Sequence, residues 1–313
     1  MSKLLKPFSN AGRFYRGNLH THSNLSDGVL APEAVINAYQ KAGYDFITLS
    51  DHFIKRYGFP ISDTTSFRNP AFTTILGAEL HAPVTSAGEL WHILANGLPL
   101  DFEPPQDGEN GPALALRARN AGAFVTIAHP AWSRYTIEDG RALLSAAHAV
   151  EIYNHGCATE NDLGDGWYLH DQLLNEGHHL SAIATDDAHF KSPDYFGGWV
   201  NVKAESLDPA ALLAALKANA FYSSQGPEFH AISLEGKHVE ITCSPVDYIT
   251  VVSGTSRSCT RHGTAITSAA FDLATLDDGW LLEKPSPWFR VTAIDHGGKK
   301  AWSNAYWWDE VHA

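Results

Sequence analysis

The stretch Gly17-Asn18-Leu19-His20-Thr21-His22, with Ser26-Asp27-Gly28 shortly after it, gives the first indication of the fold of this chain. The first segment is predicted to be a strand because a helix signal follows it at Pro32-Glu33-Ala34-Val35-Ile36, where proline suits the first helical turn. Residues i and i+2 of a strand point the same way, so His20 and His22 can hold one cation together. We therefore expect a metal site at the C-terminal end of this strand.

The composition is that of a globular protein. The chain has 313 residues, of which 44% are apolar and 18% charged, enough for one large domain with an appendage or for two domains. Its formal net charge of −13 argues against an extended nucleic-acid surface and against an anionic membrane surface. An anionic substrate must then meet a local positive centre, which bound divalent cations could supply.

The localisation and redox chemistry follow from what the sequence lacks. Residues 1–7 have no apolar signal-peptide core, and no segment approaches the roughly 20 apolar residues that span a bilayer, so we expect a soluble, cytoplasmic protein. Cys157, Cys243 and Cys259 are odd in number and show no CxxC spacing, which argues against a disulfide framework and a thiolate zinc site. The oligomeric state stays open.

Strands and helices alternate along the first two thirds of the chain. From residue 17 to about 225, short apolar strands alternate with helical segments, including one long helix expected near 161–176. This is the pattern of β/α units around a parallel sheet, and a barrel is its natural closure.

The pattern changes at Gly226-Pro227, which interrupts the β/α rhythm. Beyond it, short strands such as 239–242 and 248–252 are separated only by turns, which suggests a small β-sandwich. We predict a barrel domain over residues 1–226 and a β-sandwich-like domain over residues 227–313.

Histidines and carboxylates gather at the ends of predicted strands. Twelve of the 17 histidines precede residue 190, and β/α barrels build active sites at the C-terminal ends of their strands. The candidate ligands are His20, His22, Asp27, His52, Glu79, His92, His129, Asp187 and His189. Nitrogen and oxygen donors of this kind suit Mn²⁺, Fe²⁺ or Zn²⁺, and two or three cations could share one carboxylate.

Five ordered motifs resemble those of the PHP (polymerase and histidinol phosphatase) superfamily of metal-dependent hydrolases. They are HxHxxxxDG at residues 20–28, Ser50-Asp51-His52, Gly77-Ala78-Glu79, Ala128-His129-Pro130 and Asp187-Ala188-His189. The resemblance covers residues 17 to about 225 and implies a distorted barrel of the (β/α)7 type. Four other segments resemble the subgroup of the carbaryl hydrolases, which is called CehA/McbA-like. They are residues 150–154, 197–200, 290–295 and 301–304.

The resemblance also implies how the ligands divide among three metals. One metal would be held by His20, His22, Glu79 and Asp187. A second would be held by Glu79, His92 and His129, and a third by Asp27, His52 and His189. Glu79 would then bridge two cations.

Other residues on the same loops are candidates for contact with the substrate. Arg134, which follows a ligand loop, is the preferred group for gripping a phosphate, ahead of Lys55, Arg56 and Lys191. His155, like His81 and His170, could donate a proton to a substrate or leaving group, or could simply pack. Asp187 is preferred to Asp186 as a ligand because of its Asp-x-His spacing, and Asp186 would orient a ligating histidine.

The favoured function is hydrolysis of a phosphomonoester or phosphodiester by a metal-bound hydroxide, because a cluster of dications suits the charge on phosphoryl oxygens. The first alternative, implied by the subgroup resemblance, is hydrolysis of a carbamate, ester or amide. The second is a metal-binding scaffold without catalysis, against which the complete ligand set argues. The expected partner is a small-molecule substrate, a phosphate ester, and we expect neither an extended nucleic-acid surface nor a membrane contact.

Overall fold

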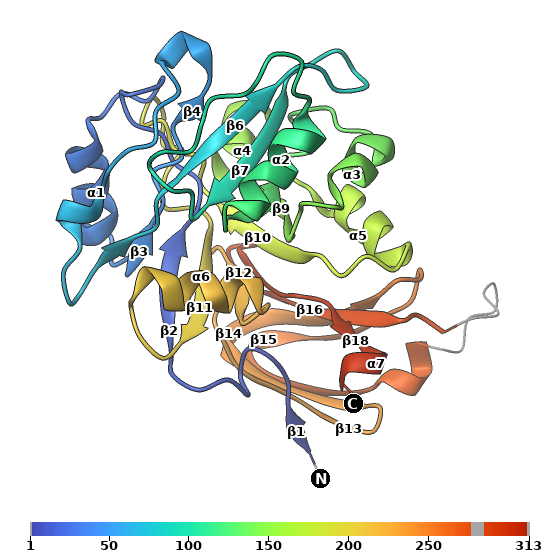
Figure 1. Cartoon of the computed structure of the whole chain (residues 1–313). Helices are drawn as coiled ribbons and strands as arrows, with labels where there is room; N and C mark the ends of the chain where they lie inside the picture. Colours follow the sequence, from blue (N-terminus) through green and yellow to red (C-terminus); the bar gives the residue numbers. More distant parts are fainter. Residues whose placement is uncertain (1, 277–284, 312–313) are drawn as a thin grey trace.

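The computed structural model of the chain describes residues 2–276 and 285–311. Within these residues the strands form two sheets, one of six strands and one of twelve (Figure 1). None of the described helices is both long and apolar enough to span a membrane. The N-terminal strand β1 (Lys3–Leu4) pairs with a strand from the last third of the chain, so the two termini lie at the same end of the molecule.

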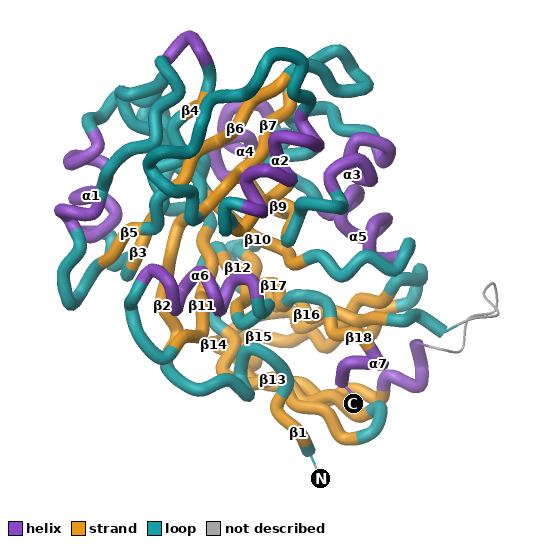
Figure 2. Tube along the Cα trace, in the orientation of Figure 1, coloured by secondary structure: helices purple, strands orange, loops and turns teal. Residues whose placement is uncertain are grey.

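The six-stranded sheet has the order β10-β9-β8-β7-β6-β4. Its strands are β4 (His52–Phe53), β6 (Gly77–Ala82), β7 (Trp91–Asn96), β8 (Phe124–Ile127), β9 (Ala149–Asn154) and β10 (Ser181–Thr185). The neighbouring helices are α2 (Gly111–Asn120), α3 (Ile137–Leu143), α4 (His155–Asn161) and α5 (Trp167–Asn175). Figure 2 shows these helices around this sheet.

One strand of this sheet runs against the expected parallel pattern. Strand β7 is antiparallel to both β6 and β8, whereas the other pairs are parallel. The connection from β6 to β7 covers only residues 83–90, which is too short for the crossover that two parallel strands need. A hairpin therefore replaces one β/α unit.

The twelve-stranded sheet contains β1 and the remaining strands of the first 226 residues. The latter are β2 (Arg13–Asn18), β3 (Phe46–Ile47), β5 (Thr73–Thr74), β11 (Trp199–Ala204) and β12 (Phe221–Ser224). Helix α1 (Pro32–Lys41) connects β2 to β3, and α6 (Pro209–Lys217) connects β11 to β12. Short 3₁₀ turns lie at Lys55–Tyr57, Thr65–Phe67 and Leu273–Leu276.

The same sheet continues into the last third of the chain. Its strands there are β13 (Phe229–Glu235), β14 (His238–Ser253), β15 (Ser258–Asp272), β16 (Trp288–Ile294), β17 (Lys300–Ser303) and β18 (Tyr306–Trp307), with α7 (Trp308–Val311) at the end. Strand β12 pairs with β11 on one side and β17 on the other. The hydrogen bonding thus runs directly across the predicted boundary at residue 226.

Strand β14 joins two predicted strands, 239–242 and 248–252, into one. Its first part pairs with β13 and its last part with β16, while β15 follows it along both parts. One hydrophobic cluster contains Ile241 from the first part and Val251 from the second. The strand therefore links two parts of the sheet that share a core. The finer expectations, a seven-unit barrel and a β-sandwich, stay predictions.

The long helix expected near 161–176 is wrong, because the chain forms α4 and α5 with a turn between them. Asp162 ends α4 in the left-handed conformation, with φ at +61°. A Cβ at Gly164 would lie 2.4 Å from the Asn154 carbonyl oxygen, and one at Gly166 would lie 2.2 Å from that of Glu151. The two glycines let this turn pass close over β9.

Backbone hydrogen bonds continue beyond the regular strands and draw the two sheets together. The Asp187 N–H donates to the His20 carbonyl and the His22 N–H donates to the Ala188 carbonyl, each at 2.9 Å. The Glu79 N–H donates to the Ser50 carbonyl at 3.0 Å. The predicted ligand segments are thereby placed side by side. Beneath them, one hydrophobic cluster takes residues from both sheets, including Leu19, Leu94, Phe124, Ile183 and Val200.

The last third of the chain packs on strands that belong to the other sheet. The Trp302 ring lies 6.0 Å from that of Tyr153 and 6.2 Å from that of Trp167, between ring centroids. The Ala182 N–H donates to Asn304 Oδ1 at 2.7 Å. We expect a chain cut after residue 225 to aggregate, because it loses these contacts and the β17 partner of β12.

Size-exclusion chromatography of the truncated chain measures this. A soluble, monodisperse product that retains the metal content of the full chain would contradict the expectation.

Candidate metal centre

A cavity of about 280 Å³ lies where the ligand-bearing segments meet. Six of the predicted ligands line it: Asp27, His52, His92, His129, Asp187 and His189. The other three, His20, His22 and Glu79, are fully buried beside it, with 0% of their surface exposed. All nine residues belong to groups whose ligand atoms lie within 4.8 Å of one another.

Glu79, in the middle of β6, lies at the centre of this arrangement. Its Oε1 atom is 2.6 Å from His92 Nδ1 and 3.1 Å from His129 Nε2. Its Oε2 atom is 2.7 Å from His52 Nδ1. The two carboxylate oxygens thus face different histidines, which is the geometry that a carboxylate between two cations requires.

A second group surrounds Asp187, which follows β10. Its Oδ1 atom lies 3.1 Å from His20 Nε2 and 2.9 Å from His22 Nε2. Both imidazole nitrogens also lie 3.6 Å from Glu79 Oε2. His20 and His22 therefore meet the same two carboxylates, as expected of side chains two residues apart at a strand end.

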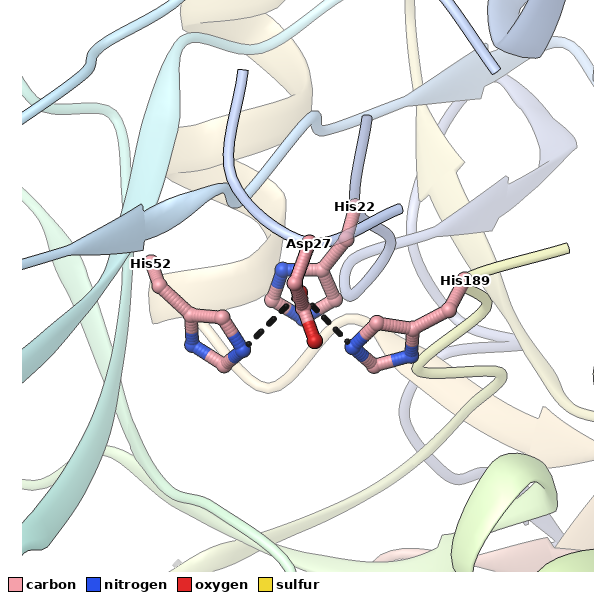
Figure 3. Close-up of side chains that lie close together, drawn as sticks. All are labelled: His22, Asp27, His52 and His189. Carbon is pink, nitrogen blue, oxygen red and sulfur yellow. Dashed lines mark ion pairs between the residues drawn. The ribbon is translucent and has the colours of Figure 1, made fainter. Parts of the chain in front are cut away.

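The third group is drawn in Figure 3, where His52 and His189 approach Asp27 from opposite sides and His22 lies behind it. Asp27 Oδ1 lies 3.3 Å from His52 Nε2 and 3.2 Å from His189 Nε2. The His22 ring lies between the two others, with centroids 4.3 Å from His52 and 4.4 Å from His189. Three histidines and one carboxylate thus surround a single point.

The chemistry of these residues fits divalent cations. Buried atoms without a hydrogen-bond partner include His20 Nε2, His22 Nδ1, Asp27 Oδ1 and Glu79 Oε2. Such atoms cost free energy unless a ligand satisfies them. Nitrogen and carboxylate oxygen are the donors that Mn²⁺, Fe²⁺ and Zn²⁺ share. The cluster therefore suits metals better than it suits a hydrogen-bonded core.

Electrostatics supports this interpretation. Burial alone would raise the pKa of Glu79, but the imidazoles of His52 and His92 hold it well below its ordinary value. Burial opposes protonation of His52, yet the carboxylates of Glu79 and Asp27 raise its pKa to about 10. Carboxylates that stay ionised in such a site attract cations, whether protons or metals.

Glu151, in β9, supports the site without lying on the cavity wall. Its Oε1 atom is 2.9 Å from His20 Nδ1, and its Oε2 atom accepts the His129 N–H at 2.6 Å. It also accepts hydrogen bonds from Asn154 and Thr185. A carboxylate behind a ligating imidazole fixes its tautomer and ring orientation. This role was not predicted, although an acidic residue between the apolar Val150 and Ile152 of a strand is a signal for it.

Asp186 does not contact a predicted ligand histidine, although it was expected to orient one. It accepts hydrogen bonds from the Tyr39 hydroxyl and from the backbone N–H groups of Phe196, Gly197 and Gly198, at 2.7 to 2.9 Å. These contacts anchor the loop before β11. Burial raises its pKa to about 6. In the described residues Glu151, and not Asp186, is the carboxylate that contacts a predicted ligand histidine from behind.

Arg134 and His155 lie elsewhere than expected. Arg134 is exposed and adopts a left-handed conformation with φ at +57°, and it does not line the cavity. His155 Nδ1 lies 2.9 Å from the Tyr153 hydroxyl, and His155 is likewise absent from the cavity wall. Lys191 lines the cavity instead, with Nζ 2.9 Å from Asp27 Oδ2.

Four further residues complete the cavity wall: Trp132, Gly156, Cys157 and Glu160. The cavity wall therefore combines six predicted ligands with Lys191, Trp132, Gly156, Cys157 and Glu160.

Two other histidines were candidates for proton donation. His81 Nε2 lies 2.8 Å from His52 Nδ1, so His81 supports the His52 ring. His170 is buried between Trp167 and the Leu180 carbonyl, away from the cavity.

No family model matches the sequence, and no curated protein matches it either. Among solved structures, the chain is similar to a two-domain protein from Bacteroides vulgatus ATCC 8482 that contains a predicted PHP-like metal-dependent phosphoesterase. The two share 15% sequence identity over 93% of each chain, with a TM-score of 0.54. At this identity the similarity concerns the fold alone: the chain shares the fold of a protein that contains a predicted PHP-like domain.

Two other solved structures are similar over a smaller part of this chain. One is a protein from Bifidobacterium adolescentis ATCC 15703 that is assumed to be a metal-dependent phosphoesterase. The two chains share 16% identity, and the match covers 64% of this chain and 96% of that chain, with a TM-score of 0.42. The other is PsfC from Pseudomonas syringae PB-5123. It shares 14% identity with this chain, and the match covers 61% of this chain and 83% of that chain, with a TM-score of 0.42.

The positions of the carboxylates predict which substitution costs more metal. Glu79→Gln removes a charge that faces histidines of two groups, so we expect the purified variant to lose metal from at least two positions. Asp27→Asn is the matched control and should lose no more than one ion per chain. Plasma mass spectrometry measures the metal, with circular dichroism confirming the fold. Equal metal content in wild type and Glu79→Gln would contradict the central role of Glu79.

The raised pKa of His52 predicts that metal binding releases protons. Metal-free protein should hold a proton on His52 at pH 7, because its pKa of about 10 lies above that pH. A metal ligand must be neutral, so binding of Mn²⁺ or Zn²⁺ should release at least one proton, and fewer as the pH approaches 10. Calorimetric titration in buffers of different ionisation enthalpy counts these protons, and His52→Gln should release fewer. A binding heat independent of buffer would refute this.

Proposed function

We propose that this chain, which has the fold of a protein containing a predicted PHP-like phosphoesterase, is itself a metal-dependent hydrolase of the PHP superfamily that cleaves small phosphoesters. The observation that carries the proposal is the clustering of nine nitrogen- and oxygen-donor residues, six on the wall of one cavity and three buried beside it. A cavity of about 280 Å³ suits a small molecule.

We assign the residues to two or three divalent cations, Mn²⁺, Fe²⁺ or Zn²⁺. His20, His22, Glu79 and Asp187 would hold one, Glu79, His92 and His129 a second, and Asp27, His52 and His189 a third. When bound, such cations polarise a phosphoryl oxygen and lower the pKa of water. Glu151 and His81 would orient the ligating imidazoles of His20 and His52 by the contacts described above.

Lys191 favours a phosphoester over the neutral carbamate, ester or amide of the alternative. Its ammonium group lies on the cavity wall beside Asp27, and about half of its side chain is exposed. A phosphate brings negative charge that an ammonium can bind, whereas a neutral substrate gains little from it. We therefore assign the phosphate contact to Lys191 and not to Arg134, whose exposed side chain lies off the cavity wall.

We also propose different roles for the two parts of the chain. Residues 1–226 supply the ligands and would form the hydrolase barrel. Residues 227–313 would form a β-sandwich whose role is structural, because Arg290 Nη2 binds Asp171 Oδ2 at 2.8 Å and its guanidinium lies 3.7 Å from the Trp167 ring centre. These contacts brace helix α5, which packs against β9, the strand that carries Glu151.

The proposed activity requires metal. Treatment with a strong chelator should abolish hydrolysis of p-nitrophenyl phosphate and bis(p-nitrophenyl) phosphate, and Mn²⁺, Fe²⁺ or Zn²⁺ should restore it. The same panel should include 1-naphthyl carbamate and ester substrates. Full activity of the metal-free protein would overturn the metal-dependent function, and faster cleavage of the carbamates or esters would favour the alternative.

Lys191→Ala tests the assignment of the phosphate contact. Loss of one charged contact to a phosphate is worth about 2 kcal/mol, so kcat/KM for phosphoesters should fall roughly 30-fold. Arg134→Ala is the matched control and should change kcat/KM less than about twofold. Steady-state kinetics at constant metal content measures both. A larger loss in Arg134→Ala than in Lys191→Ala would return the phosphate contact to Arg134.

A further inference from the structure

Trp132 is more exposed than the other tryptophan side chains of the described residues. Trp91, Trp288, Trp302 and Trp307 are at most 5% exposed, whereas Trp132 is 41% exposed. It also lines the cavity of the metal centre. An indole carries a large apolar surface that normally contributes to folding by burial. Leaving it open toward a cavity is typical of a surface that a ligand covers.

The turn that carries Trp132 is held in place on both sides. The Ser133 N–H donates to the His129 carbonyl at 3.0 Å, and Ser133 Oγ lies 2.9 Å from His129 Nδ1. The Tyr135 hydroxyl accepts the His92 N–H at 2.6 Å and donates to the His92 carbonyl at 3.0 Å. The indole is therefore part of a fixed wall.

The indole lies directly beside two predicted ligands. Its ring centre is 5.2 Å from that of His92 and 5.1 Å from that of His129, with interplanar angles of 69° and 78°. Any group bound against it would be attached close to the bond that reacts. The wall residues outside the predicted ligands and Trp132 are Gly156, Cys157, Glu160 and Lys191, of which the first two are small.

We propose that this cavity takes phosphoesters whose leaving group is a flat aromatic ring, and that Trp132 selects that ring. The inference rests on the proposed hydrolase function and names its substrate class. A flat ring gains from stacking or edge contact with an indole beyond the area that it buries. A saturated ring of the same size gains only the buried area.

Two substrates with primary alcohols as leaving groups isolate this effect. Benzyl phosphate and cyclohexylmethyl phosphate have similar size, and they differ in whether the ring is flat and aromatic. We expect the metal-loaded wild type to prefer benzyl phosphate by roughly tenfold in kcat/KM, the scale of one aromatic pair. Each substrate has the same intrinsic reactivity in every variant. A change in the ratio between variants therefore reports on the protein and not on the leaving group.

Three variants separate selection from a merely structural role. Trp132→Leu keeps an apolar side chain but removes the ring, and it should bring the ratio close to one. Trp132→Phe keeps an aromatic ring and should retain most of the preference. Tyr168→Ala removes another exposed aromatic side chain, 79% exposed and absent from the cavity wall, and should leave the ratio unchanged. Equal losses for both substrates in Trp132→Leu would overturn the proposal.

A binding experiment keeps the inference testable apart from turnover. Benzylphosphonate and cyclohexylmethylphosphonate cannot be hydrolysed, and their affinities for metal-loaded protein are measured by calorimetry. Tighter binding of benzylphosphonate in wild type, lost in Trp132→Leu, supports the inference even if no phosphoester is cleaved and the proposed function fails. Equal affinities in wild type overturn the inference, even if phosphoesters are cleaved and the proposed function stands.

Discussion

The fully buried carboxylate of Glu79 constrains everything around it. An ionised carboxylate without water is costly unless opposite charges or hydrogen-bond donors surround it. Here His52, His92 and His129 contact its two oxygens, and these imidazoles hold its pKa well below the ordinary value, which favours the ionised form. Those three histidines come from different strands or strand ends, so the arrangement holds only while the strands keep their register.

Carboxylates behind the cavity act differently from those that face it. Glu151 accepts hydrogen bonds at both oxygens and contacts His20 and the backbone of His129, and Asp186 ties Tyr39 to the loop before β11. Their oxygens are already used by the protein, whereas Asp27 and Glu79 each retain a buried oxygen without a hydrogen bond. This difference separates Glu151 and Asp186 from Asp27 and Glu79, although all four are acidic residues of the same region; Asp187 differs from Glu151 and Asp186 in lining the cavity, although both of its oxygens also accept hydrogen bonds.

The last third of the chain contacts the strands that carry residues of the candidate site. Strand β17 pairs with β12, the Trp302 ring packs near Tyr153, and Asn304 accepts the Ala182 N–H. Tyr153 and Ala182 belong to β9 and β10, the strands that carry Glu151 and lead into Asp187. Sheet continuity across residue 226 therefore couples the C-terminal strands to the orientation of the candidate ligands, even though none of those ligands lies beyond residue 189.

The sequence alone identified the candidate metal ligands, because a spacing such as that of His20 and His22 is local and does not depend on how the strands pack. The mixed α/β class of the fold followed from the alternation of strand and helix patterns. Only the tertiary structure decided the rest: the antiparallel β7, the role of Glu151, the exposed Trp132, and the presence of Lys191 on the cavity wall in place of Arg134. Lys191 meets Asp27 across 164 residues, and a left-handed turn holds Arg134 off that wall. Local patterns carry no information about such contacts, because long-range pairing and backbone turns set the direction of each side chain.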